Sequence, residues 1–118
     1  MLKTVKIVAK RAHALRFGFD QGEKVIVTGG ASSNKPILQV VADVFQLPVH
    51  VNTKTQNSAA MGAAYRALYC AGDRSKSYND TVGEAVKLDL AAAPNANVKT
   101  HYDKLVRVYS DIEDELKS

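Results

Sequence analysis

One stretch of ten residues, VIVTGGASSN at Val25–Asn34, constrains the fold of this chain more than any other. The β-branched run at Lys24–Thr28 is typical of a short strand that is buried on both faces. Two glycines then allow a tight turn, and Lys35-Pro36 follows before an apolar run at helical spacing. The stretch therefore predicts a strand, a turn and a helix in direct succession.

The hydrophobic pattern elsewhere also alternates between helices and strands. It predicts helices over residues 1–19, 36–46, 58–71 and from about Thr100 onward, and a second strand at Val49–Val51. The first helix should bury Val5, Val8, Ala12, Leu15 and Phe19. The basic residues of Lys3–Arg16 are predicted to form a solvated face rather than to lie near a cleft. Residues 72–100 should be mainly loop, with one helical turn near Val82–Leu88. This order favours an α/β fold in which parallel strands are flanked by helices, but two strands make an incomplete sheet.

Composition and charge exclude several classes of protein. The 118 residues carry a net charge of +4 that is spread along the chain, and aromatic residues are few, so we expect no nucleic-acid partner. The apolar runs are too short for a membrane span or a signal peptide, so we expect a cytoplasmic protein without a membrane partner. Cys70 cannot form an intramolecular disulfide and should be a buried small side chain. The three histidines lack metal-ligand spacing, so we expect no protein-held metal site.

The turn after the first strand has the features of a nucleotide site. Gly29 and Gly30 lack a Cβ, so a phosphate or a ribose could lie against their backbone. The amides at the start of the next helix attract anions, and Asn34 offers an amide that could contact adenine or ribose. A tight turn with Asn34 as the helix cap explains the same residues without a ligand. From the residues alone both explanations stay open.

A longer pattern adds a family resemblance. TGGASSNKPILQVVADVFQLPVHV, followed by NSAAMGAAYRA, resembles the C-terminal domain of the FGGY carbohydrate kinases, and within them the xylulose kinases. The resemblance includes the leading segment KIVAKRAHALRFGF and the trailing segment YDKLVRVYSDIEDEL, so residues 1–118 are expected to be a partial C-terminal domain. It implies a partial ribonuclease-H-like fold of the actin-like ATPase type, in which upstream strands and the N-terminal domain are absent.

The resemblance also implies a site and a reaction. Gly29, Gly30, Ala31 and Asn34 match family positions that line the nucleotide. The implied reaction is transfer of the γ-phosphoryl group of ATP to D-xylulose, which gives xylulose 5-phosphate, with Mg²⁺ held mainly by the phosphates. D-xylulose would bind mainly to the missing N-terminal domain.

We assign no catalytic residue to this chain, because the family's catalytic aspartate lies upstream of the matching segment. Asp43 is expected to be structural or solvated, and the acidic residues of the C-terminal segment are expected to form a solvated face (Asp111, Glu113, Asp114 and Glu115). The isolated chain should therefore be inactive. Two alternatives remain: the same piece of a glycerol, gluconate or ribulose kinase, or a non-catalytic α/β fragment that self-associates through unpaired strands.

Overall fold

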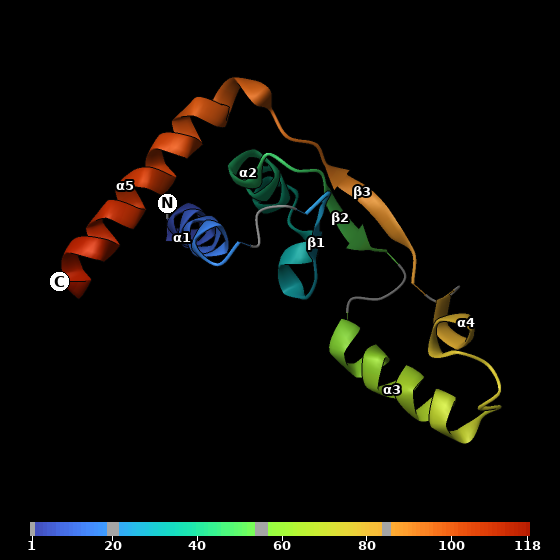
Figure 1. Cartoon of the computed structure of the whole chain (residues 1–118). Coiled ribbons are helices and arrows are strands. Elements are labelled where there is room, and N and C mark those ends of the chain that lie inside the picture. The colour runs from blue at the N-terminus through green and yellow to red at the C-terminus, as the bar shows by residue number, and fades with distance from the viewer. Residues whose placement is uncertain (1, 19–21, 54–56, 84–85) are drawn as a thin grey trace.

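The computed structural model describes residues 2–18, 22–53, 57–83 and 86–118. The elements follow the order α1 (Leu2–Arg16), β1 (Val25–Val27), η1 (Gly30–Ser33), α2 (Lys35–Phe45), β2 (Val49–Asn52), α3 (Ser58–Ala71), α4 (Tyr78–Val82), β3 (Leu88–Ala92), η3 (Ala96–Val98) and α5 (Lys99–Lys117). The strand–turn–helix unit that the sequence predicted is present, because β1 leads through the short 3₁₀ turn η1 into α2 (Figure 1).

The sheet has three strands in the order β1-β2-β3. β1 and β2 are parallel, as expected, with Val25 opposite Val49. β3 is antiparallel to β2 and has an irregularity at Val49/His50, so the sheet is mixed rather than wholly parallel. Among the described residues β1 pairs only with β2, so the outer edge of β1 has no strand partner there.

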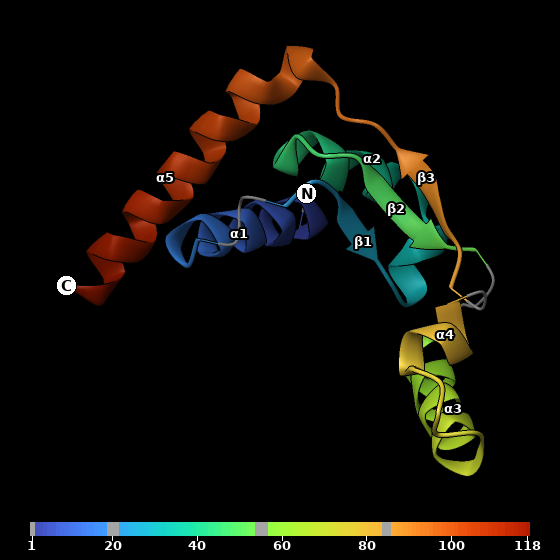
Figure 2. The same cartoon turned by 45° about the vertical axis from the view of Figure 1, so that its right-hand side comes forward.

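Helix α2 lies between the sheet and the two terminal helices (Figure 2). Its Leu38 and Ala42 pack with Val49 and Ala92 in a core against the sheet. Its Val44 joins a second core with residues of α1 and with Val106 of α5. Since one helix supplies both cores, the position of α2, and with it the turn that opens α2, is fixed from two sides.

Salt bridges join α1 to α5. Arg11 pairs with Asp103 at 2.7 Å and Arg16 with Asp114 at 2.7 Å, while His13 Nε2 lies 3.0 Å from Glu113 Oε1. The acidic residues Glu113 and Asp114 are therefore not merely a solvated face, because they contact the basic residues of α1. These contacts fix which face of α1 points toward α5 and which face points away from it.

Helices α3 and α4 extend away from the rest of the molecule (Figures 1 and 2). No residue of α3 is buried, and Leu68 is 57% exposed. The radius of gyration is 17.5 Å, whereas a compact chain of this length would have about 13–14 Å. A Cβ built on Gly62 meets no atom within 4 Å, so no described segment of this chain packs closely against α3 at that position.

Several local predictions were also wrong. Helix α1 buries Val8 and Ala12 as predicted, but it also buries Ile7, while Val5 and Leu15 are 52% and 40% exposed. The buried stripe is therefore rotated relative to the predicted one, and Phe19 lies outside the described residues. The segment expected to be loop contains α4 and β3, and β3 forms because β2 offers it an edge. Cys70 is exposed, since nothing described covers its side of α3.

Candidate nucleotide-binding turn

Gly29 gives the turn its shape. Its φ of 80° and ψ of −161° fall in a region that residues with a Cβ strongly disfavour. The Gly29 carbonyl oxygen accepts hydrogen bonds from the Ser32 amide at 3.0 Å and from Ser32 Oγ at 2.6 Å. The first glycine is therefore explained by backbone geometry alone.

Gly30 has no such explanation. It does not have a positive φ, and a Cβ built on it meets no atom of the chain within 4 Å. Neither backbone strain nor a close neighbour requires a glycine at this position. The absence of a Cβ therefore leaves open space beside the backbone of Gly30, at the carboxyl end of β1.

Asn34 caps helix α2. Its Oδ1 accepts a hydrogen bond from the Ile37 amide at 3.2 Å, and Pro36 occupies the first turn of the helix, as the sequence predicted. Capping uses only the acceptor of the side-chain amide. The exposed Nδ2 group carries the two donors with which Asn34 could contact a ligand.

A cavity of about 670 Å³ brings most of the predicted site residues together. Gly30, Ala31 and Asn34 line it, whereas Gly29 is not among the lining residues. Ile37, Val41 and Phe45 of α2 add an apolar wall. The volume lies within the range of about 300–1,000 Å³ that is usual for small-molecule sites. An apolar wall beside exposed backbone at a helix start suits a base and its attached phosphates.

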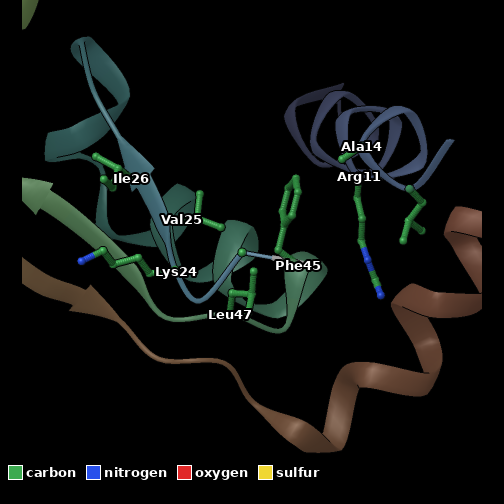
Figure 3. Close-up of a pocket in the computed structure, with 9 residues that line it drawn as sticks. Arg11, Ala14, Lys24, Val25, Ile26, Phe45 and Leu47 are labelled. Carbon is green, nitrogen blue, oxygen red and sulfur yellow. The ribbon is translucent and has the colours of Figure 1, made fainter. Parts of the chain in front are cut away.

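Helix α1 also lines this cavity, through Lys3, Lys6 and Lys10. A smaller cavity of about 350 Å³ continues along β1 and is lined by Arg11 and Ala14 at the other end of α1 (Figure 3). The N-terminal half of α1 thus lines the cavity that the turn also lines, and the C-terminal half of α1 lines the cavity at the start of β1. The Arg11 guanidinium turns toward α5, where it pairs with Asp103.

The charges on α1 differ between its two sides. The Arg11 side is neutralised by α5, and the pKa of Asp103 is lowered chiefly by its hydrogen bond from Lys99, with a further contribution from Arg11. The pKa of Glu113 is likewise lowered, first by its hydrogen bond with His13. On the cavity side no aspartate or glutamate occurs among the residues described as lining it. The cavity is therefore electropositive.

The carboxylates of the chain lie elsewhere. Asp43 Oδ1 accepts hydrogen bonds from Gln39 Nε2 at 2.9 Å and from the Asn95 amide at 2.8 Å, so it ties the segment after β3 to α2. This role is structural, as expected.

In the described ranges no three histidine, cysteine, aspartate or glutamate residues are grouped so that they could hold a metal ion. Within them, no helix has the length and hydrophobicity to cross a membrane.

The lysines are the part of the site that sequence reasoning missed. We expected Lys3–Arg16 to be a solvated face, but Lys3, Lys6 and Lys10 line the same cavity as the turn. Their spacing of three and four places them on one side of a helix, which was visible in the sequence. The position of α1 across the cavity from the turn was not visible in the sequence, because it depends on the packing of α1 against α2 and α5.

Known proteins are similar to this chain in sequence and in fold. Residues 8–71 match the C-terminal domain of the FGGY family of carbohydrate kinases. The chain is 40% identical to the xylulose kinase of Rattus norvegicus and 41% identical to that of Mus musculus, in each case over 96% of the chain. It spans only about a fifth of the length of these relatives, 22% and 21%.

A solved structure supports the fold assignment. The ligand-bound xylulose kinase from Lactobacillus acidophilus superposes on 81% of this chain and 19% of its own, with a TM-score of 0.67 and 23% sequence identity. The predicted α/β class and the resemblance to an actin-like ATPase domain are thus confirmed at the level of fold.

Proposed function

Because this chain belongs to the FGGY family of carbohydrate kinases, we propose that its η1 turn is the nucleotide-binding part of a kinase that phosphorylates D-xylulose. The observation that carries this proposal is the position of Gly30, Ala31 and Asn34 around one cavity, with open space where a Cβ of Gly30 would stand. We further propose that residues 1–118 correspond to part of the C-terminal domain of such a kinase.

Each of the four residues has a separate role in this proposal. Gly29 sets the direction of the turn, and Gly30 lets a phosphate or a ribose approach the backbone. Ala31 forms part of the wall, while Asn34 holds the start of α2 and presents Nδ2 to the nucleotide. ATP would supply the transferable phosphoryl group, and its Mg²⁺ would be held mainly by the phosphates, since the cavity lining contains no carboxylate among the described residues.

The choice of sugar rests on the relatives. The two mammalian proteins are xylulose kinases, and identity of 40–41% over nearly the whole chain supports the same substrate. If the residues that bind the sugar differ from those of the xylulose kinases, glycerol, gluconate or ribulose would be the substrate. Those residues are expected in the N-terminal domain. The transfer of a phosphoryl group to a hydroxyl also requires a carboxylate that accepts its proton, and none is found among the described residues that line this cavity. The chain by itself should therefore not transfer phosphate.

Ligand-dependent stabilisation tests the proposed nucleotide site. Mg-ATP at ten times its dissociation constant should add about 1.4 kcal/mol to the free energy of unfolding, which raises the melting temperature by several degrees. Ala31→Leu places bulk in the cavity and should remove this increase, while Ala63→Leu on the exposed surface of α3 should preserve it. An unchanged melting temperature in the wild-type chain at millimolar Mg-ATP, with cooperative unfolding, would contradict the proposal.

Activity of the isolated chain is tested separately. A coupled assay for ADP release with D-xylulose should give no turnover above the blank. Turnover above the blank that depends on D-xylulose would show that a complete catalytic site exists in these residues.

A second role, self-association, is favoured by one set of observations. The outer edge of β1 is unpaired among the described residues, and α3 buries none of its side chains. Unpaired strand edges and uncovered helices favour association with other chains. Sedimentation equilibrium should then show a dimer or larger species, and a stable monomer at all concentrations would rule this role out.

A further inference from the structure

Helix α5 carries a row of apolar side chains that no described part of the chain covers. Four residues that repeat at steps of three, four and four lie on one side of this helix: Leu105, Val108, Ile112 and Leu116. Their exposed fractions range from 37% to 83%. We call this row the α5 stripe. Large apolar side chains that gather on one exposed face mark a contact surface, whereas single exposed ones do not.

The α5 stripe lies next to the side of α5 that packs within the chain. Val106 is buried in the core that α5 shares with α1 and α2, and Tyr102 and Tyr109 pack against that core. In both views α1 and α2 lie between α5 and the strands (Figures 1 and 2). The stripe therefore belongs to the outermost helical layer, and it is separated from the unpaired edge of β1.

Two charged residues flank the α5 stripe. Because an α-helix turns by about 100° per residue, Lys104 and Glu115 both lie along the edge of the stripe that is farther from Tyr102 and Tyr109. Both side chains are exposed, and in the described ranges neither forms a salt bridge. This edge of the stripe thus carries a positive charge near its beginning and a negative charge near its end.

An antiparallel pair of α5 helices covers the stripe and pairs these charges at the same time. Lys104 and Glu115 are centred at about residue 110, and so is the stripe, so one two-fold axis serves both. This axis brings Val108 of one copy opposite Ile112 of the other, and it brings Lys104 beside Glu115 at both ends of the contact. A parallel pair would instead place Lys104 and Glu115 of the two copies on opposite edges.

We propose that the α5 stripe binds a second copy of this chain, through antiparallel packing of the two α5 helices. Neither β1 nor α3, the surfaces considered above for self-association, takes part in this interface. The proposed nucleotide site is not required for it either. A contact along a single helix buries less than about 1,200 Å² in total, which is the size range of weak, reversible complexes. The dimer should therefore depend on the concentration of the chain.

Sedimentation equilibrium of this chain between about 10 μM and 1 mM tests the apolar part of the interface. The wild-type chain should change from monomer to dimer over this range. The test variant is Val108→Gln, Ile112→Gln, because glutamine is a good helix former. The matched control is Leu68→Gln, Leu90→Gln, which alters two exposed apolar residues outside α5. Circular dichroism establishes whether both variants keep their secondary structure.

The test variant should dimerise about 100-fold or more weakly than the wild-type chain. Each substitution occurs twice in a two-fold dimer, and the burial of each half-exposed aliphatic side chain is worth a factor of roughly three to ten. The control should dimerise like the wild-type chain.

Charge exchange tests the orientation of the two helices. Lys104→Glu alone and Glu115→Lys alone should each weaken the dimer by roughly 2- to 30-fold, because two exposed pairs are lost. The double variant Lys104→Glu, Glu115→Lys should restore the wild-type affinity, since each new glutamate again lies beside a lysine of the other copy. This restoration also answers for any variant that fails to fold, because the double variant keeps the whole apolar stripe.

The outcomes decide between the possible occupants of the stripe. A monomer at all concentrations up to about 1 mM would overturn the proposal and leave the stripe to a different partner. A dimer that is weakened equally by the test variant and the control, or by the control alone, would assign association to α3 and the sheet. A double charge variant that stays as weak as the single variants would overturn the antiparallel arrangement, and with it the interface proposed here.

Discussion

Replacement of Gly30 by alanine tests whether this glycine is needed for ligand binding or for the backbone conformation of the turn. The chain itself has room for the added methyl group, because no atom lies within 4 Å of that position and the φ of Gly30 is not positive. Gly→Ala at a compatible position stabilises a protein by about 0.4–1 kcal/mol, since the unfolded chain loses conformational freedom. Gly30→Ala should therefore leave the free energy of unfolding unchanged or slightly raise it.

Nucleotide binding should respond in the opposite direction. A methyl group forced into a close contact costs about 1–3 kcal/mol. That corresponds to a loss of roughly 5- to 150-fold in the affinity for Mg-ATP. Gly29→Ala serves as the contrasting variant: at a φ of 80° it should lower the free energy of unfolding by about 1–3 kcal/mol. Urea denaturation measures stability, and calorimetric titration measures binding.

Two results would refute this reasoning. If Gly30→Ala binds Mg-ATP as tightly as the wild-type chain, the ligand does not approach Gly30 and the open space has another explanation. If Gly30→Ala is destabilised by more than about 1 kcal/mol, the second glycine is required by the fold itself. The doublet would then be a structural turn, which is the alternative that the residues alone left open.

Substitutions at two further residues, Asn34 and Asp103, test the cap of α2 and the salt bridge between α1 and α5. Asn34→Asp should keep the cap of α2, since aspartate caps a helix as well as asparagine does. It should weaken Mg-ATP binding, because the Nδ2 donors are lost. Asn34→Ala should weaken binding and also lower the free energy of unfolding by about 0.5–2 kcal/mol in urea denaturation. Because the pKa of Asp103 is lowered in the folded state, its stabilising contribution is complete above its ordinary pKa of 3.8 and is lost as the pH falls through the lowered value. Asp103→Asn should therefore destabilise the chain modestly at pH 7 and make unfolding less sensitive to acid, and an equal effect of the substitution at pH 7 and pH 2 would contradict this assignment.

The local structure around the turn could be predicted from the sequence. The β-branched run, the glycines, Asn34 and Pro36 each favour the conformation that they adopt, so β1, the turn and α2 follow from short-range preferences. The register of β1 beside β2 follows from two apolar segments that α2 covers together.

Features that depend on distant contacts could not be predicted. β3 has no strong strand pattern, and it forms because β2 offers an antiparallel edge. The rotation of α1, which buries Ile7 instead of Val5, depends on α2 and on the salt bridges to α5. The place of the lysines in the site follows from that rotation. Their spacing was visible in the sequence, but the surface that they face was not.

The central claim is that the η1 turn is a nucleotide site, and an amide NMR titration of this chain with Mg-ATP tests it most directly. The claim predicts a dispersed spectrum in which the largest shifts belong to Gly29–Asn34. A dispersed spectrum that stays unchanged over Gly29–Asn34 at millimolar Mg-ATP would contradict it.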